Sequence, residues 1–553
     1  MRINRRRALS LLGIGAGLAG LSPVRAQGAP AFAYGVASGD PAADSLLLWT
    51  HAGAAGTVRW QVAADRDFKQ IVKRGSATTT AARDHTVKVV ATGLMPGVTY
   101  FYRFLAGKAV SPVGQAKTPP VGPADDLVLV SACCALYPGG YFNAYQAVAD
   151  LPRVDAVIHL GDYIYESAGE KDGDYAYEIG SPLGRLPDPP AACVTLSDYR
   201  RRFAQARRDP QLQAAHARAA WICCWDDHDL ANDSWKDGAQ AHDDARQGPF
   251  SVRKAAAVQA FYEWMPIRDP QKGQAFEAIN RSFDFGDLAS FTMLETRLTA
   301  RDHQLTLRDV SRDPSGKPDV AAFAVKLKDP TRRMLSGAQE FWLGLTLKNS
   351  VRTGKAWQLI GSGVGLARIA APDLRAQMVP EAWTALQASI TGYYKGALAE
   401  DMAMTAYDIP RGLDSWDGYP GARARLYYLI KNAQARCVVL SGDSHMAWVN
   451  ELRDDAGRRV AAEFGSTALT SPGFGDSLPP GTPLAEAFVK RNREVVFAEA
   501  FHKGFVLTTV TRDAVKGELI GVSTVVEKTF ETRVIKAFRV VPEGATVSRP
   551  VPI

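Results

Sequence analysis

Four short segments of this chain carry the residue types that bind metal ions or transfer protons. The first is a pair of adjacent cysteines, Cys133 and Cys134. The others read Gly-Asp-Tyr-Ile-Tyr-Glu at 161–166, Asp-Asp-His-Asp-Leu-Ala-Asn-Asp at 226–233 and Ser-Gly-Asp-Ser-His at 441–445. Carboxylate and amide oxygens suit Ca²⁺, Mg²⁺ or Mn²⁺, whereas a thiolate or a phenolate favours a more Lewis-acidic ion such as Fe³⁺. The mixture indicates a centre with more than one metal ion.

Each of these segments follows a short apolar run. The runs cover 127–130, 156–160, 221–225 and 436–440, and such continuous apolar runs are typical of strands buried on both faces. In open α/β sheets, ligands bind in the crevice beyond the carboxyl ends of the strands. We therefore expect the four segments to converge on one crevice. Paired metals there could stabilise both oxygens of an in-line displacement, which indicates hydrolysis of phosphate esters.

The segments between these runs have helical and strand patterns. An amphipathic helix is expected at 142–151, which gives a βαβ unit, and further helices are expected around 253–264 and 339–348. The closing segments, such as 519–526, are β-rich. The sequence therefore predicts an α/β catalytic domain over 124–545.

Residues 30–118 have a different pattern. Short alternating runs, such as 45–50 and 100–104, are separated by Gly, Pro, Asp and Asn turns and show no helical periodicity. This pattern predicts a small β-sandwich domain. The segment Pro-Pro-Val-Gly-Pro at 119–123 is then expected to be a stiff linker to the catalytic domain.

Residues 1–26 have the features of an export signal. Arginines precede an apolar run at 8–21, and small residues permit cleavage near Ala26-Gln27. The Arg6-Arg7 pair resembles a twin-arginine signal, which predicts export through the Tat machinery to the periplasm or the outside. An uncleaved membrane anchor is the alternative, but the apolar run is too short to span a bilayer.

Composition limits the classes of protein that fit. The 553 residues are 46% hydrophobic and 22% charged, as in an ordinary folded protein, so collagen-like and disordered chains are excluded. The net charge of +7 falls to +2 without the five arginines of the leader, so composition gives no argument for nucleic-acid binding. The mature chain contains no run long enough for a stable membrane span.

Each candidate also has a structural interpretation. Asp162 could cap a helix, and 226–229 could be a solvated acidic loop. Cys133 and Cys134 could be core residues or part of a disulfide. His159 lies in mid-strand, so we expect a hydrogen-bonded core residue rather than a ligand.

Several of these motifs, in this order along the chain, resemble one known family. They are found at 32–41, 48–50, 140–145, 161–166, 225–232, 414–420 and 441–448. The family is that of PhoD-like alkaline phosphatases and phosphodiesterases, which includes some phospholipase D enzymes. The resemblance covers nearly the whole chain. It implies an α/β (α+β) metallophosphoesterase-like catalytic domain with a central β-sandwich flanked by helices, preceded by a small all-β domain of immunoglobulin or fibronectin-III type.

The resemblance further implies a centre that contains Fe³⁺ and Ca²⁺, with Zn²⁺, Mn²⁺ or Mg²⁺ as other candidates. Asp162 matches the carboxylate expected to bridge the metals, and Tyr165 matches a tyrosinate on iron. Asp443 and His445 match an Asp-x-His pair of ligands. For the thiolate ligand, counting back from the Gly-Tyr-Phe run at 140–142 favours Cys134.

The cysteine assignment keeps two alternatives. The family pattern has one cysteine before the Gly-Tyr-Phe run, whereas this chain has Cys133 and Cys134. Cys133 is the second choice, and a vicinal disulfide between the two would remove the thiolate.

The remaining candidates belong to the calcium side and to catalysis. Asp227 and Asn232 are the expected calcium ligands, and Asp227, His228 and Arg297 form the expected catalytic set. His228 is placed like a histidine that acts as a general acid or contacts the phosphate. Arg297 and Arg301 could each clamp a phosphate, with surface salt bridges as the default interpretation.

The expected function is that of a secreted metal-dependent phosphohydrolase of alkaline phosphatase D type. Its partners would be small-molecule phosphate mono- and diesters, attacked in line by a metal-activated hydroxide. A phospholipase D or a dedicated phosphodiesterase acting on lipid or polymer substrates is the alternative. A secreted binding protein without catalytic activity is a further one.

Overall fold

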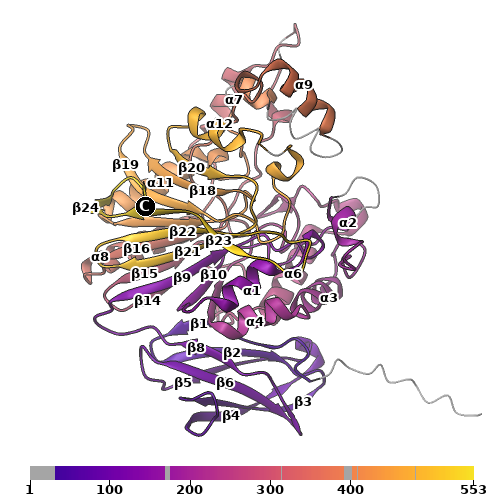
Figure 1. Ribbon diagram of the computed structural model, residues 1–553, viewed down its shortest axis with the longest axis vertical. Coiled ribbons are helices and arrows are strands. Elements are labelled where there is room, and N and C mark those ends of the chain that lie inside the picture. Colours follow the sequence, from indigo (N-terminus) through magenta and orange to yellow (C-terminus); the bar gives the residue numbers. More distant parts are fainter. Residues whose placement is uncertain (1–30, 169–174, 313, 391–401, 408, 480) are drawn as a thin grey trace, which may run out of the picture.

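A computed structural model describes residues 31–168, 175–312, 314–390, 402–407, 409–479 and 481–553 (Figure 1). The predicted export signal at 1–26 lies outside these residues. Of the helices in the described part, none has the length and apolar character needed to cross a membrane.

Two large β-sheets stack on each other in the middle of the molecule. In spatial order, the ten-stranded sheet consists of β26 (Val551–Pro552), β23 (Thr532–Val540), β22 (Val515–Val522), β21 (Gly504–Thr511), β9 (Asp126–Ala132), β10 (Ala156–His159), β11 (Ala220–Cys223), β1 (Val36–Ala42), β2 (Ser45–His51) and β5 (Thr86–Thr92). The seven-stranded sheet consists of β14 (Arg281–Phe285), β15 (Ala289–Met293), β16 (Trp357–Ser362), β17 (Cys437–Ser441), β19 (Arg459–Gly465), β18 (Ala447–Arg453) and β20 (Val495–Glu499).

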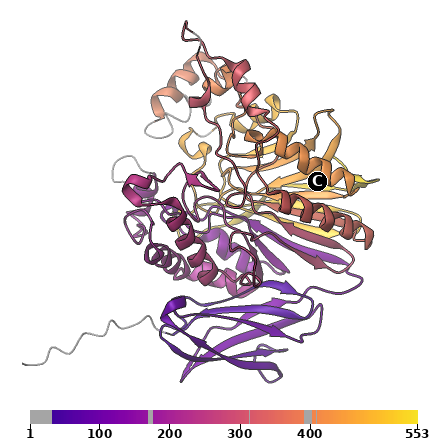
Figure 2. The same cartoon turned by 180° about the vertical axis from the view of Figure 1, so that it is seen from behind.

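The core between the sheets is built from the apolar runs seen in the sequence. Leu129, Ile158 and Ile222 of the larger sheet share one buried cluster with Leu359 and Val438 of the smaller sheet. Helices cover the outer faces, because the other side of each strand is apolar as well. The helices on the larger sheet are α1 (Asn143–Asp150), α3 (Leu196–Arg207), α4 (Pro210–Arg218) and α6 (Phe250–Trp264), and those on the smaller sheet are α8 (Gly337–Arg352) and α11 (Pro420–Asn432). Figure 2 shows the molecule from behind, with α8 and α11 on its outside.

The predicted helices and strands are present, with shifts of a few residues. The helix expected at 142–151 is α1, and the strand expected at 519–526 is β22, which begins and ends four residues earlier. The central β-sandwich flanked by helices that the resemblance implies is present, with β9, β10 and β11 in the larger sheet and β17 in the smaller one. The four chemistry-bearing loops therefore meet at an edge of a two-sheet sandwich.

The first strands of the chain are continuous with this sandwich. β1 pairs in parallel with β11, with Ser38 opposite Ala220, so β1, β2 and β5 extend the larger sheet. A five-stranded sheet packs on them, made of β4 (Ile71–Thr79), β3 (Gly56–Ala63), β6 (Thr99–Ala106), β7 (Ala109–Val110) and β8 (Gly114–Lys117). The domain boundary at 119–123 stays a prediction.

The remaining elements lie at the periphery. Short hairpins are formed by β12 (Ser234–Trp235) with β13 (Gly238–Ala239) and by β24 (Pro542–Glu543) with β25 (Thr546–Val547). Further helices are α2 (Tyr175–Gly180), α5 (Asp244–Gln247), α7 (Val320–Leu327), α9 (Pro380–Ser389) and α12 (Leu484–Arg491). α7, α9 and α12 lie at the end of the molecule opposite the five-stranded sheet (Figure 1).

Candidate metal centre

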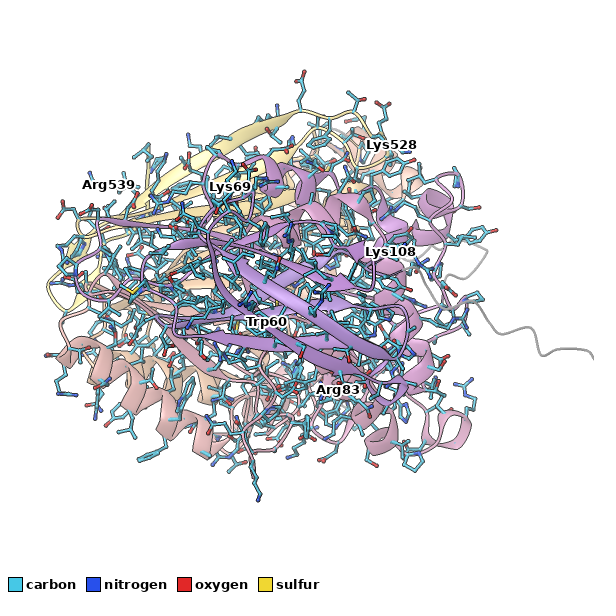
Figure 3. All side chains as sticks on the ribbon, turned by 90° about the horizontal axis from the view of Figure 1, so that it is seen from below. Trp60, Lys69, Arg83, Lys108, Lys528 and Arg539 are labelled. Carbon is cyan, nitrogen blue, oxygen red and sulfur yellow. The ribbon has the colours of Figure 1, made fainter. Side chains whose placement is uncertain are left out.

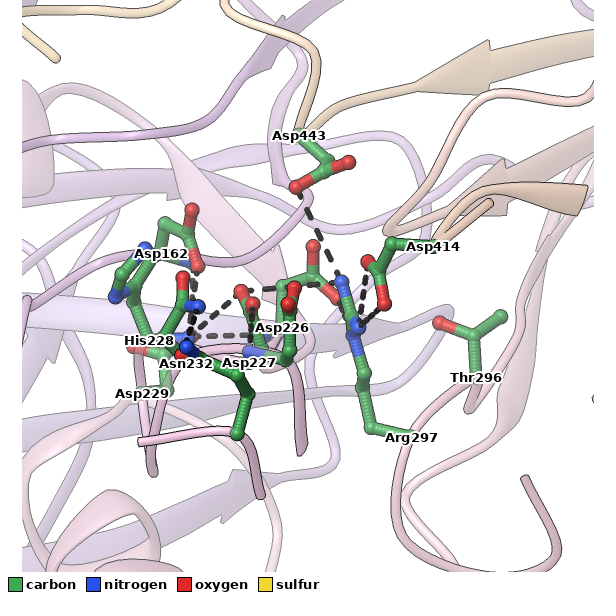
Figure 4. Close-up of polar contacts among 12 residues, drawn as sticks. Asp162, Asp226, Asp227, His228, Asp229, Asn232, Thr296, Arg297, Asp414 and Asp443 are labelled. Carbon is green, nitrogen blue, oxygen red and sulfur yellow. Dashed lines mark hydrogen bonds and ion pairs between the residues drawn. The ribbon is translucent and has the colours of Figure 1, made fainter. Parts of the chain in front are cut away.

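The loops after β9, β10, β11 and β17 bring their polar side chains together around Asp162. Ligand atoms of Asp162, Cys134 and His445 all lie within 4.8 Å of one another. The same is true of a second group, made of Asp162, Asp226, Asp227 and Asp443. The Asp162 carboxylate is thus shared by a thiol–imidazole group and a carboxylate group. Figure 4 shows the carboxylate group.

The backbone of these loops is held in an uncommon conformation. Cys134, Asp162, Asp443 and His445 all have positive φ, at 60°, 55°, 71° and 56°. Such left-handed residues other than glycine are uncommon and concentrate at functional sites. Gly161 has φ 114°, and a Cβ there would lie 2.5 Å from the Asp226 amide nitrogen, so only glycine permits this contact between the two loops.

Asp229 fastens the same two loops to each other. One carboxylate oxygen accepts the backbone N–H groups of Tyr163 and Ile164, at 3.0 and 3.2 Å. The other accepts those of Asp162 and Asp226, at 2.9 and 3.0 Å. Asp229 is fully buried and was not among the predicted site residues. Its position three residues after Asp226 was the available signal, since an Asx side chain often caps nearby backbone N–H groups.

Tyr165 and His445 meet on one side of Asp162. The Tyr165 hydroxyl donates to Asp162 Oδ2 at 3.1 Å and lies 3.2 Å from His445 Nε2. His445 Nδ1 donates to the Pro472 carbonyl at 2.7 Å, which leaves Nε2 as the nitrogen with a free lone pair. Burial, and then Lys503, lowers the pKa of His445 to about 4, so the imidazole is neutral, as a metal ligand must be.

The two cysteines point to different surroundings. Cys134 belongs to the group with Asp162 and His445, whereas the Cys133 thiol faces the carbonyls of Ser466 and Thr467, at 3.8 and 3.7 Å. All six cysteines are free thiols, so the vicinal disulfide is absent from this structure. Burial raises the pKa of the Cys134 thiol well above its usual range.

His228 is oriented by a residue that sequence reasoning missed. Its Nδ1 bonds to Glu166 Oε2 at 2.8 Å, and Glu166 Oε1 accepts the Asn232 backbone N–H at 2.7 Å. The imidazole also packs on the Tyr165 ring, with 4.2 Å between centroids. Burial opposes protonation, but Asp227 and Glu166 raise the pKa of His228 well above its usual value. Glu166 closes the Gly-Asp-Tyr-Ile-Tyr-Glu run, which was the signal for its role.

Asp227 and Asn232 lie near Asp162 and His228 (Figure 4). Asp227 accepts the backbone N–H groups of His228 and Asp233 at 2.9 and 2.6 Å. Burial raises its pKa, but Arg297 and His228 outweigh burial, and the pKa of Asp227 is low. The Asn232 amide donates to Gln240 at 3.1 Å, so its oxygen is the atom left to bind a cation.

Arg297 does not form the surface salt bridge that was its default interpretation. Arg297 and Arg301 are fully buried rather than engaged in surface salt bridges. Arg297 pairs with Asp226 and, at 2.8 Å, with Asp414, and Arg301 pairs with the same Asp414. Arg297 Nη2 has no hydrogen-bond partner in the described part of the chain and lies 3.8 and 3.9 Å from Asp227 and Asp443. Only this nitrogen is left to contact a ligand.

The donor set fits metal ions. Burial, and then neighbouring carboxylates such as Asp227 and Asp226, raises the pKa values of Asp162 and Asp443 well above their usual range. The buried Asp226 Oδ2 has no hydrogen-bond partner among the residues that the structure describes. A further group, missed in part from the sequence, combines Asp227 with Asp233 and Asp414 within 4.8 Å. Bound cations would relieve this surplus of acceptors and negative charge.

The prediction for His159 is confirmed. Its Nε2 is hydrogen-bonded to the Tyr145 hydroxyl at 2.8 Å, and the ring is completely buried between aromatic side chains. His159 is therefore a core residue.

Known proteins resemble this chain along most of its length. The sequence profile of the PhoD-like phosphatases matches residues 128–519, and that of their N-terminal domain matches residues 19–120. Alkaline phosphatase D of Bacillus subtilis (strain 168) is 33% identical over 499 residues, which cover 87% of this chain and 76% of that protein.

Two solved structures superpose on this chain. A structure of PhoD superposes with a TM-score of 0.74 at 31% identity and covers 94% of this chain and 92% of that one. A purple acid phosphatase from yellow lupin (Lupinus luteus), 14% identical, has a TM-score of 0.50 over 92% of this chain and 73% of its own, which shows a shared fold only. With the profile match covering well over half of its residues, the chain belongs to the PhoD-like phosphatase family and is a phosphatase.

Proposed function

We propose that this phosphatase is a metal-dependent phosphohydrolase of alkaline phosphatase D type that acts on phosphate mono- and diesters. The observation that carries the proposal is the sharing of Asp162 between a thiol–imidazole group and a carboxylate group within 4.8 Å. A carboxylate shared in this way can bridge two ions, and paired ions suit phosphoryl chemistry.

The donor types support two different ions. Cys134, Tyr165 and His445 supply sulfur, phenol oxygen and nitrogen, which favour a transition ion, and we assign Fe³⁺ to them together with Asp162. Asp227, Asn232 and Asp443 supply oxygens alone, which favour Ca²⁺. When bound, the ions act as Lewis acids that lower the pKa of water and neutralise charge on the phosphate.

His228 is the residue best placed to give a proton to the leaving group. Glu166 holds its Nδ1 at 2.8 Å, so Nε2 is the nitrogen free to face a substrate. A histidine oriented by a carboxylate in this way can hold a proton at one defined atom. Arg297 Nη2, which has no hydrogen-bond partner among the described residues, is available for a phosphate oxygen. Because Asp226 and Asp414 hold the rest of its guanidinium, its position does not depend on the substrate.

We also infer that the chain is exported. The arginines at 5–7 and the apolar run at 8–21 match a twin-arginine signal, with cleavage near Ala26-Gln27. Export would place the site among phosphate esters of the periplasm or the medium.

Metal content and visible absorption of the purified protein test the assignment directly. We expect iron and calcium, with a charge-transfer band from the Tyr165 phenolate to Fe³⁺. Asp162→Asn should lose bound metal and turnover of both p-nitrophenyl phosphate and bis-p-nitrophenyl phosphate. Asp513→Asn, an exposed change in the β21–β22 turn, should lose neither.

Three results would count against parts of the proposal. Zinc or manganese alone, without the band, would replace the iron assignment. Full turnover by Asp162→Asn would overturn the metal centre. Turnover of a phospholipid at the expense of both nitrophenyl esters would favour the phospholipase D alternative.

A further inference from the structure

Charge is unevenly distributed along this chain. Residues 31–120 contain ten lysines and arginines and five acidic residues, a net charge of +5. Residues 121–553 contain 50 basic and 53 acidic residues, a net charge of −3. The positive charge of the described protein therefore resides in its first strands, away from the metal centre.

The five-stranded sheet carries most of this charge. Its strands β3, β4, β6, β7 and β8 contain five basic residues and no acidic one. The basic residues are Arg59, Lys73, Arg74, Arg103 and Lys117. Acidic residues flank the sheet only in its connecting turns, as at Asp65 and Asp67.

The strand register places three of the arginines on one face. Arg103 and Arg74 both lie opposite Gln61. The side chains of Arg103, Gln61 and Arg74 therefore form one row across β6, β3 and β4. Arg59 lies two residues before Gln61 on β3 and therefore points to the same side. The opposite side carries Val58, Val62, Tyr102 and Phe104, which pack in the core.

This basic face, defined by Arg59, Arg74 and Arg103, is turned outward. Arg59 and Arg74 are exposed, and neither forms an ion pair with any residue in the described part of the chain. Arg103 is held in place by Phe68, 4.0 Å from its guanidinium, and donates to Gln61 at 2.9 Å. Figure 3 views the molecule from this side, with the sheet in front of the helices and with Lys69 and Lys108 in the turns around it.

Apolar side chains are interspersed on the same face. Leu105 lies two residues after Arg103 and pairs with Val110 on β7, so both point outward beside it. Val110 is 54% exposed. Phe101, two residues before Arg103, is partly exposed on the same side. The face thus combines cationic and apolar groups without any carboxylate.

We propose that this face binds the surface of a bilayer that contains anionic phospholipids. Arginines attract such a surface over about a Debye length, and apolar side chains among them enter the interfacial region. A soluble polyanion would use the arginines but would gain nothing from Val110, Leu105 and Phe101. A broad face without carboxylates also suits a surface better than a single bound ion, because its three arginines lie on three different strands.

Vesicle co-sedimentation tests this proposal. The chain from Gln27 onward, which contains every described residue but not the arginines of the leader, is mixed with vesicles of phosphatidylcholine alone or in equal parts with phosphatidylglycerol. We expect binding only to the anionic vesicles, weakening as salt is raised. The variant Arg59→Gln/Arg74→Gln/Arg103→Gln should bind about 150-fold more weakly, since each basic residue near an anionic surface contributes about a fivefold factor.

Controls separate this result from a loss of folding and from general charge effects. Lys348→Gln/Arg352→Gln/Arg375→Gln removes the same charge from three exposed positions, two in α8 and one between β16 and α9. This variant should bind as wild type does. If the triple variant loses phosphatase activity, Arg59→Gln/Arg74→Gln spares the Phe68 contact and should still bind about 30-fold more weakly. Equal binding to both kinds of vesicle, or equal losses in the α8 control, would overturn the proposal.

Val110→Ser distinguishes a bilayer from a polyanion. It should weaken vesicle binding several-fold and leave retention on heparin–agarose unchanged. Strong heparin binding together with no binding to anionic vesicles would show that the face recognises a soluble polyanion instead.

Discussion

The prediction that reaches furthest into the site concerns Asp229, which is no metal ligand. Its two carboxylate oxygens accept four backbone N–H groups, two each, from the loops that carry Asp162 and Asp226. Asp229→Asn keeps the shape of the side chain but replaces one oxygen by an N–H₂ group, which cannot accept. Two backbone N–H groups then face a donor, and the two loops lose the contact that sets their spacing.

The size of the effect follows from this geometry. A hydrogen bond to a charged group contributes about 1.5–3 kcal/mol, so two lost bonds weaken the joined loops by about 3–6 kcal/mol. Burial raises the pKa of Asp229 to about 7, against the effect of its N–H donors, so the carboxylate is ionised in an assay run well above that pH. If about 3 kcal/mol of this loss reduces the binding free energy of the metal at Asp162, metal affinity falls by about 100-fold. A fall of this size is typical when a residue that orients metal ligands is changed.

Metal competition measures this directly. Wild type, Asp229→Asn and the exposed control Asp513→Asn are dialysed against a graded series of chelator concentrations, and bound metal is determined by mass spectrometry. Asp229→Asn should lose its metal at a chelator concentration about 100-fold lower than wild type does. It should regain most of its turnover when metal is in excess. A metal affinity equal to that of wild type would refute the view that Asp229 sets the position of Asp162.

Three further predictions address other parts of the structure. Glu166→Gln should lower kcat about tenfold or more with little change in metal content, because His228 loses the carboxylate that orients it; a change in metal content alone would contradict this. Cys134→Ser should abolish the iron content while Cys133→Ser retains it, since only Cys134 belongs to the group around Asp162. Burial lowers the pKa of Lys88 from 10.5 to about 8. Between these two pH values the unfolded state binds more protons than the folded state, so the free energy of unfolding rises with pH. In urea unfolding, Lys88→Met should lack this rise.

Much of the fold could be read from local patterns because each buried strand is a continuous apolar run. The strands β9, β10, β11 and β17 coincide with such runs within a few residues. Their distribution over two sheets could not be read in this way. It depends on long-range pairing, such as that of β1 with β11, to which a local pattern is blind. For the same reason, the parallel pairing of β1 with the main sheet was not foreseen.

The site residues divide along a similar line. Side chains that follow a strand directly, such as Asp162 and Asp443, were accessible from spacing and resemblance. Those that act through a partner distant in sequence were not. Asp414 is one example, since its significance depends on Arg297 and Arg301, which precede it by more than a hundred residues. Glu166 and Asp229 were visible in the motifs, but their hydrogen bonds are made across loops.

The two buried arginines show how charge is distributed within the centre. Arg297 is held between Asp226 and Asp414, and Arg301 also pairs with Asp414. Two positive charges therefore compensate two carboxylates, of which Asp226 belongs to the group around Asp162 and Asp414 to the group around Asp227. Both guanidiniums are completely buried, and Arg297 reaches Asp227 and Asp443 only at 3.8 and 3.9 Å, so these two carboxylates and Asp162 have no hydrogen-bonded arginine among the described residues.

The negative charges that the two arginines do not compensate indicate how much positive charge a bound cofactor must supply. Asp162, Asp227 and Asp443 carry three negative charges when ionised, and the Cys134 thiolate and Tyr165 phenolate would bring the total to five. A single divalent ion cannot neutralise this set in a buried site, where an unpaired charge costs several kcal/mol. An Fe³⁺–Ca²⁺ pair supplies five positive charges, which match the five negative charges of this set. The proposed pair of ions is thus supported by the number of charges as well as by the types of donor atom.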